Sequence, residues 1–150
     1  MYQTPLSDRK CVFMIVPLVH DPVFLAIPSR KATKSDKQIA MNLLDTLSFH
    51  KASCVGMAAN MIGCAVQIIA FDHAGEYEIM YNPEILMKFG AYEAEESCLS
   101  LLGAPRKTTR YQSIQVRFQN AAFQTETRIY TGFTAEIIQH EIDHLNGILI

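Results

Sequence analysis

The chain has 150 residues, of which 49% are hydrophobic and 19% are charged, and its net charge is -2. This size and balance predict one globular domain over residues 1–150. The weakly acidic charge provides no electrostatic footprint for nucleic acid, so we expect no nucleic-acid binding.

The first segment combines charged residues with a short apolar run, CVFMIVPLV (11–19). The run lacks a signal-peptide cleavage site and is far shorter than the roughly 20 residues that span a bilayer. We therefore expect a buried strand or an extended segment, and no membrane association. Because Met14 is an alternative start, residues 1–13 are either a leader or a poorly ordered segment.

The four cysteines contain no C-x-x-C pair and no small disulfide framework, so we expect free thiols and a cytoplasmic protein. They are Cys11, Cys54, Cys64 and Cys98.

A first helix is predicted over residues 35–50. Ser35 and Gln38 have the spacing of a capping box, and an apolar stripe follows at i, i+4 and i+8. The preceding basic stretch, RKATKSDK (30–37), is predicted to be a solvated loop and helix start, in preference to a nucleic-acid patch. The stripe consists of Ile39, Leu43 and Leu47.

The middle of the chain is predicted to be mainly antiparallel strands. A small-residue segment at 55–63, VGMAANMIG, indicates a tight loop or strand edge. Strand signals follow at 65–72, 76–82, 113–120 and 125–132, with the second strand expected to end at Asn82-Pro83. Together with the flanking helices, this order predicts an α+β fold with antiparallel sheets around a central C-terminal helix.

That C-terminal helix is predicted over residues 133–145, followed by a stop at Asn146-Gly147. It carries the H-E-x-x-H pattern of His140, Glu141 and His144. The i, i+4 spacing lets both imidazoles reach one ion, while Glu141 reaches a water bound to it. The alternative is a pair of packed or surface histidines. Since the helix is apolar on two sides, we expect it to be buried.

A site of this kind usually takes a third protein ligand. No residue after His144 has a suitable side chain, so the third ligand must come from upstream. Residue types alone leave several candidates open, and a lone cysteine is more often a small buried hydrophobe than a ligand. The candidates are Cys11, His20, His50, Cys54, Cys64, His73, Cys98 and several acids.

Three segments, taken in order, resemble the motifs of peptide deformylases. EESCLS (95–100) resembles E-G-C-L-S, and QHEIDHLNGILI (139–150) resembles Q-H-E-x-D-H-L-x-G-x-L-F. VGMAANMIG (55–63) resembles G-Φ-G-Φ-A-A-x-Q-Φ-G, where Φ is hydrophobic. The resemblance covers residues 55–150.

The resemblance implies an enzyme that removes the formyl group from N-formyl-methionyl peptides of nascent proteins, with the ribosome nearby. Its metal ligands map onto Cys98, His140 and His144. The metal would be ferrous iron, which zinc, nickel or cobalt can replace. A metal-bound hydroxide would attack the formyl carbon, with Glu141 as general acid/base. The backbone N–H of Leu99 and the motif glutamine would stabilise the oxyanion.

The resemblance also implies substrate-binding roles for Val55, Gly56, Met61, Leu99 and Ile137. Met61 stands where the family has the glutamine, and it has no hydrogen to donate. We do not expect the neighbouring amide of Asn60 to substitute. Ser97 replaces a glycine and would be strained if its φ were positive. Asp143 is either a solvent-facing carboxylate or a group that orients a ligand.

The leading hypothesis is therefore a deformylase of reduced activity. The alternative is a weakly active or non-catalytic deformylase-like metal protein that binds peptide N-termini. A third, weaker hypothesis is a different metallo-amidase or peptidase.

Overall fold

The computed structural model describes residues 14–150, so Cys11 and the predicted leader at 1–13 lie outside the described residues. Two 3₁₀ turns, η2 (Lys34–Asp36) and η3 (Ala59–Ile62), accompany the helices and strands. The helices and strands are α1 (Pro22–Leu25), α2 (Lys37–Phe49), β1 (Gly56–Ala58), β2 (Ile68–His73), β3 (Glu76–Glu96), β4 (Arg106–Gln119), β5 (Thr125–Thr131) and α3 (Gly132–Leu145).

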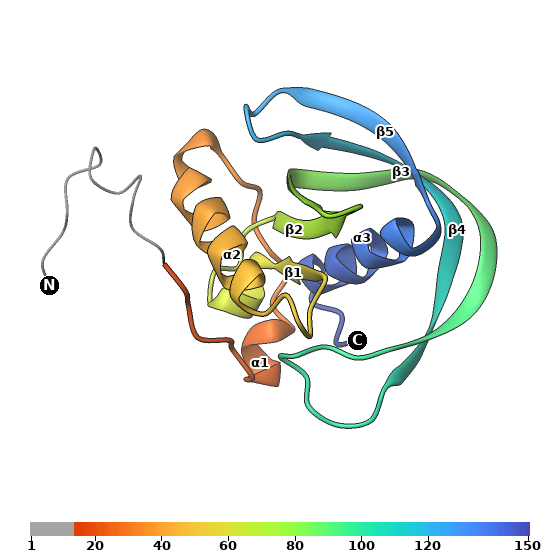
Figure 1. The fold of residues 1–150 in the computed structure, drawn as a ribbon, viewed down its shortest axis with the longest axis horizontal. Coiled ribbons are helices and arrows are strands. Elements are labelled where there is room, and N and C mark those ends of the chain that lie inside the picture. The colour runs from red at the N-terminus through yellow and green to blue at the C-terminus, as the bar shows by residue number, and fades with distance from the viewer. Residues whose placement is uncertain (1–13) are drawn as a thin grey trace, which may run out of the picture.

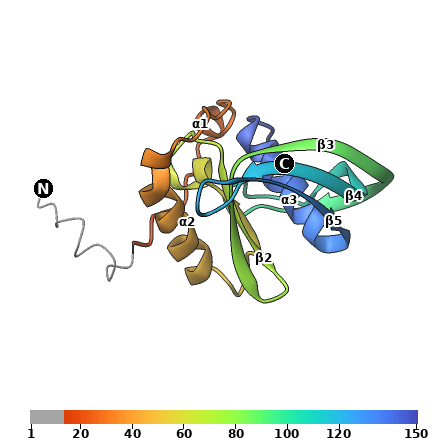
Figure 2. The same cartoon turned by 90° about the horizontal axis from the view of Figure 1, so that it is seen from above.

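The strands form one antiparallel sheet in the order β1-β2-β3-β4-β5. The sheet curves strongly, and α3 lies inside the curve while α2 packs on the side of β1 and β2 (Figures 1 and 2). One buried core cluster joins α2, the sheet and α3, and it includes Leu43 and Leu47 of α2, Phe71 of β2 and Ile138 of α3. The α+β prediction is confirmed, with the C-terminal helix at the centre.

Helix α3 is buried along most of its length, as its two apolar sides predict. The predicted stop is also confirmed. Gly147 adopts φ +76, and the N–H of Ile148 donates to the carbonyl of Asp143 at 2.9 Å. This geometry is a Schellman-type ending, which favours glycine at the left-handed position. Among the described residues, no helix is long and apolar enough to cross a membrane.

The predicted capping box of Ser35 and Gln38 at the start of α2 is wrong. The capping box lies two residues earlier, at the start of η2, where the Asp36 carboxylate accepts from the backbone N–H of Thr33 at 2.8 Å and from the Arg30 guanidinium at 2.9 and 3.0 Å. Asp36 is also the residue before α2, but its side chain makes no capping bond to that helix. Gln38 instead donates its side-chain amide to Asn42 one turn later.

The predicted break of the second strand at Pro83 is also wrong, since β3 continues to Glu96. The register with β4 shifts between Tyr81 and Glu84, and Asn82 between them has φ +52. This bulge removes the proline from the ladder, where its missing N–H would leave a gap. The Asn82 side chain stabilises the bulge by exchanging two hydrogen bonds with the Ala32 backbone, at 2.7 and 3.1 Å.

The described part of the apolar run at 11–19 is neither strand nor helix, and Met14 and Ile15 are exposed. Of the two alternatives predicted for this run, the buried strand is therefore wrong for residues 14–19, whereas the extended segment is not contradicted. The backbone there is held by two bonds to α2, from Met14 to the Asp45 carboxylate and from Val16 to the Thr46 hydroxyl, and by one to η3, from Val19 to the Met61 carbonyl. Isolated contacts of this kind do not make a ladder.

Gly147→Ala tests how closely the end of α3 approaches the α1 region. A Cβ at Gly147 would collide with the backbone carbonyl of Ala26, whereas a Cβ at Gly75 (φ +91) would meet nothing. Both replacements strain a left-handed residue by about 1–2 kcal/mol, but only Gly147→Ala adds a backbone clash. Urea denaturation should therefore show a clearly larger loss of stability for Gly147→Ala than for Gly75→Ala. Equal losses would contradict the close approach.

Candidate metal centre

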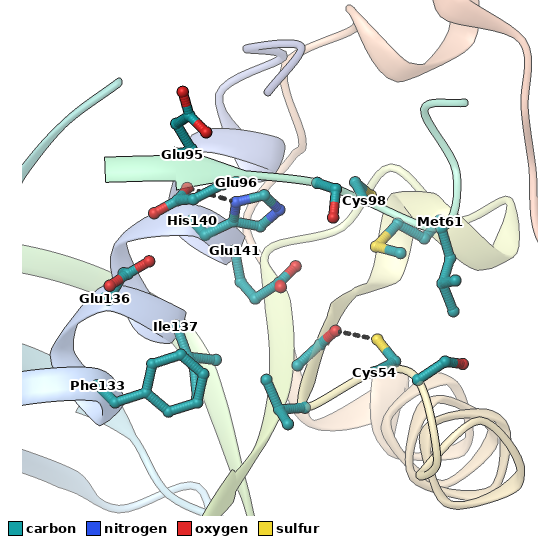
Figure 3. A pocket seen from close by; sticks show the side chains of 15 residues that line it. Cys54, Met61, Glu95, Glu96, Cys98, Phe133, Glu136, Ile137, His140 and Glu141 are labelled. Carbon is teal, nitrogen blue, oxygen red and sulfur yellow. Dashed lines mark hydrogen bonds and ion pairs between the residues drawn. The ribbon is translucent and has the colours of Figure 1, made fainter. Parts of the chain in front are cut away.

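Three predicted ligands converge inside the curve of the sheet. Cys98 follows the end of β3, and His140 and His144 lie one turn apart on α3. Figure 3 shows Cys98 and His140 on the wall of the cavity described below. One donor atom from each of the three residues lies within 4.8 Å of the other two. The two histidine Nε2 atoms are 3.0 Å apart, and both rings are buried. The other described candidates, His20, His50, Cys54, Cys64 and His73, do not join this group.

A carboxylate fixes the orientation of His140. Its Nδ1 lies 2.7 Å from Oε1 of Glu96, the last residue of β3. A carboxylate that accepts a hydrogen at Nδ1 leaves the Nε2 lone pair free, which is the usual arrangement behind a metal-ligating histidine. Glu96 is thus a functional residue for which the sequence reasoning assigned no role.

Arg110 of β4 holds Glu96 in place. Its guanidinium donates to both oxygens of Glu96 at 2.6–3.1 Å and to Asp143 of α3 at 2.6 Å. Arg110 is only 3% exposed. Burial alone would raise the pKa of Glu96, but the hydrogen bonds from His140 and Arg110 outweigh it and lower that pKa to about 2. The first role predicted for Asp143, a free solvent-facing carboxylate, is wrong, because the Asp143 side chain forms an ion pair with Arg110.

A pattern in the sequence could have located Arg110. It lies an even number of residues before the buried Ile114, Val116 and Phe118. Because alternate residues of a strand point to the same face, Arg110 is expected on the inner face of β4. A buried arginine requires an acidic partner. The sequence does not say which acid, because Glu96 and Asp143 lie on other elements.

Glu141 lies beside the converging donors. Its side chain is buried, and its Oε1 has no hydrogen-bond partner among residues 14–150. Burial raises its pKa to about 7. A Cβ at Gly56 would lie 2.6 Å from Ile137 Cγ2 and 3.0 Å from Glu141 Oε2, so only glycine lets β1 approach α3 this closely.

A cavity of about 330 Å³ opens in front of these groups. All five predicted substrate-binding residues line it: Val55, Gly56, Met61, Leu99 and Ile137. Its wall also contains Cys98, His140 and Glu141. The predicted roles therefore fall on one continuous surface, from the candidate ligands to an apolar wall.

The two departures from the family motifs behave differently. Met61 lines the cavity, and its Sδ accepts from the Ala58 N–H at 3.5 Å. Asn60 donates its side-chain amide to the His144 carbonyl at 2.9 Å and does not line the cavity, so it does not replace the missing glutamine. Ser97 is not among the described non-glycine residues with positive φ, and the expected strain is absent.

The donor set fits a divalent transition metal. Burial, together with the neighbouring His140, lowers the pKa of His144 to about 3, so this imidazole is neutral and has a lone pair to offer. Its Nδ1 has no hydrogen-bond partner in the described part of the chain, and its Nε2 lies 3.0 Å from that of His140. Two imidazoles and one thiol suit borderline ions such as Fe(II), Co(II), Ni(II) and Zn(II).

Comparison with known proteins adds independent evidence. The family model for polypeptide deformylase matches residues 15–150. The peptide deformylase of Clostridium beijerinckii is 47% identical over 137 residues, covering 91% of this chain and 100% of the relative. That of Desulforudis audaxviator is 37% identical over 142 residues, covering 92% and 90%.

Solved structures agree with these relatives. The peptide deformylase of Legionella pneumophila aligns with a TM-score of 0.81 and 30% identity, covering 90% of this chain and 83% of that one. The Thermotoga maritima enzyme aligns with a TM-score of 0.80 and 28% identity, covering 91% and 94%.

Arg110→Gln tests whether the buried charge network holds the site together. Removing one partner from a buried ionic group costs about 3–5 kcal/mol, because the remaining carboxylates stay buried without their cation. Arg117→Gln is the matched control, since Arg117 is on the same strand and its pair with Glu84 is exposed. Denaturation of the metal-free proteins should show a large loss in the free energy of unfolding for Arg110→Gln and a loss under about 1 kcal/mol for the control. Similar losses would contradict the assignment.

Proposed function

Because the chain belongs to the peptide deformylase family, we propose that it removes the formyl group from the N-terminal formyl-methionine of nascent proteins. One observation carries this proposal: the donors of Cys98, His140 and His144 converge next to a cavity whose wall includes Cys98, His140 and the carboxylate of Glu141, which has no partner among the described residues. A non-catalytic metal protein would not need a buried acid there. This feature disfavours the peptide-binding alternative, and the family relatives disfavour another metallo-amidase.

We infer that Cys98, His140 and His144 hold one divalent ion, with Fe(II) as the native metal. Zinc, nickel or cobalt would occupy the same donors in a purified sample. An ion held there supplies Lewis acidity, which polarises a carbonyl and acidifies water. Glu96 keeps the His140 ring in the orientation that presents its Nε2 to the ion.

Glu141 would act as the general acid/base. Its free Oε1 accepts a proton from the attacking water, and the same carboxyl then gives that proton to the leaving amine. A pKa raised to about 7 by burial suits both steps at neutral pH, because the group can gain and lose a proton readily. The close approach at Gly56 keeps the carboxyl against the cavity.

The oxyanion that forms during the reaction needs hydrogen-bond donors. We assign one to the backbone N–H of Leu99, which lines the cavity. Met61 stands in the place of the second donor and has no hydrogen to give. The reaction is therefore expected to be slow. Val55 and Ile137 give the cavity an apolar wall that suits a methionine side chain.

The setting of this activity is part of the same proposal. Substrates of this kind are nascent chains, so we place the protein in the cytoplasm, near ribosomes. We also propose that residues 1–150 form one domain, since the core of the described residues is a single cluster.

Glu141→Gln separates the chemistry from metal binding. The amide has nearly the same shape but cannot shuttle a proton, so kcat on a formyl-Met-Ala-Ser peptide should fall by about 10²–10⁴. The experiment uses anaerobic, metal-loaded protein, and metal content is measured for both forms. Equal metal content with the predicted loss supports the proposal. Full occupancy by iron or nickel in the unaltered protein without detectable deformylation would refute it.

Met61→Gln should restore the missing donor. One oxyanion donor typically contributes about 10²–10³ in rate, and imperfect placement reduces the gain, so kcat should rise by about tenfold or more. Met61→Leu is the control, because it keeps an apolar side chain without a donor and should leave kcat within about threefold. Steady-state kinetics on the same peptide compare the three proteins, and an unchanged rate in Met61→Gln would show that the donor is not limiting.

A further inference from the structure

Gln139, the residue before the first histidine ligand, has no role in the proposed chemistry. It lies on α3 directly before His140, and it does not line the cavity. Gln139 is nevertheless only 5% exposed. A buried amide must satisfy one acceptor oxygen and two donor hydrogens, so its partners indicate what the side chain does.

The Gln139 amide makes three hydrogen bonds, each at 2.9 Å. Its oxygen accepts from the backbone N–H of Tyr111 in β4. Its nitrogen donates to the Tyr111 carbonyl and to the carbonyl of Ala135, one turn earlier on α3. With Tyr111 the amide therefore exchanges the same pair of bonds that a residue of a neighbouring antiparallel strand would exchange.

This pair of bonds lies just past the point where β5 leaves β4. The last residue pair of the two strands is Ser113 with Thr131, and the chain enters α3 at Gly132. Tyr111 lies two residues before Ser113 on β4, beyond that last pair. Gln139 therefore continues the pairing of β4 from the helix, and α3 is bonded to the backbone of β4 as well as packed against it.

A second bond holds the next turn of α3 against the adjacent residue of β4. Arg110 donates to Asp143 at 2.6 Å, and Asp143 lies four residues after Gln139 on the same side of the helix. Each anchored position directly precedes a candidate ligand: His140 follows the first and His144 the second. Arg110 reaches α3 through a long side chain, whereas Gln139 bonds to the strand backbone itself, so Gln139 is the tighter constraint.

The third candidate ligand is fixed to the same strand from its other edge. Cys98 follows β3, whose pairing with β4 continues as far as Glu96 opposite Arg106. Strand β4 thus carries Cys98 through β3 and the two histidines through Gln139. A slide of α3 by one residue along β4 would move both imidazoles by about 1.5 Å. That shift is far larger than the roughly 0.2 Å within which metal–ligand distances vary.

We propose that Gln139 is a positioning residue of the metal centre: by pairing with Tyr111 it fixes α3 along β4 and sets where the two histidine ligands stand relative to Cys98. The inference rests on the proposed function, because it concerns the same candidate metal ligands. The amide bonds to backbone groups outside the cavity wall, so its loss acts through the placement of the ligands.

The test replaces Gln139 with methionine, which has a similar length but no hydrogen to donate. Gln139→Asn is a second variant, because its amide is one methylene too short to pair with Tyr111. The Kd of Co(II) is measured anaerobically against a competing chelator, and the visible absorption of the bound ion records its coordination geometry. Residues that orient metal ligands typically contribute about 10–100-fold in affinity, so both variants should raise the Kd by about tenfold or more and change the spectrum.

Two controls separate positioning from a general loss of stability. Gln112→Met makes the same chemical change at an exposed residue next to Tyr111. Ile138→Val trims the buried core beside Gln139 without removing its bonds. Both controls should leave the Kd and the spectrum of Co(II) unchanged. An unchanged Kd in the Gln139 variants, or an equal rise in either control, would overturn the inference.

Amide hydrogen exchange tests the same contact without metal. In the metal-free protein the Tyr111 amide should be protected, and Gln139→Met should make it exchange at least severalfold faster while the Ile114 amide stays protected. Rapid exchange of the Tyr111 amide in the unaltered protein would overturn the inference even if a variant does not fold. Failure of the unaltered protein to bind Co(II) would overturn the proposed function, whereas Tyr111 protection that depends on Gln139 would still support the anchoring of α3.

Discussion

The buried guanidinium of Arg110 is the constraint on which the rest of the site depends. A cation this deeply buried must be surrounded by acids, and it draws Glu96 from β3 and Asp143 from α3 into one network. The same Glu96 carboxylate then sets the orientation of His140. One ionic group therefore positions two strands, the central helix and a candidate ligand. Such a network adds little net stability compared with an apolar core, whereas removing one of its members is costly because the others stay buried without their counter-charge.

Within the segment at 55–63, different residues support the candidate metal ligands and affect the rate of the proposed reaction. Gly56 allows the contact with α3, and Asn60 ties the loop to the His144 carbonyl. Both features support the candidate ligands. Met61 in the same loop fills space and accepts a weak backbone contact. Gly56 and Asn60, which help to build the site, thus keep their structural contacts. Met61, by contrast, stands where the family motif has the glutamine that would assist the reaction.

The sequence predicted the features that depend on local pattern. Periodicity located α3 and its burial, the i, i+4 spacing placed His140 and His144 together, and the resemblance selected Cys98. The errors arose where distant residues decide. Asp36 completes a capping box with Thr33 at the start of η2 and is held there by Arg30, and β3 passes Pro83 because Asn82 bonds to Ala32. Likewise, the partners of Arg110 lie on other elements, so no local signal could name them.

The route of the chain between Glu96 and His140 has a consequence for folding kinetics. These residues are 44 positions apart, and all of β4 and β5 lies between them. The long antiparallel pairing of β3 with β4 connects the two segments along the chain. Bringing such distant segments together has a high entropic cost and slows folding. Contacts that form after the folding transition state slow unfolding more than they speed folding, so we expect an ion held by Cys98 and the histidines of α3 to act chiefly on the unfolding rate.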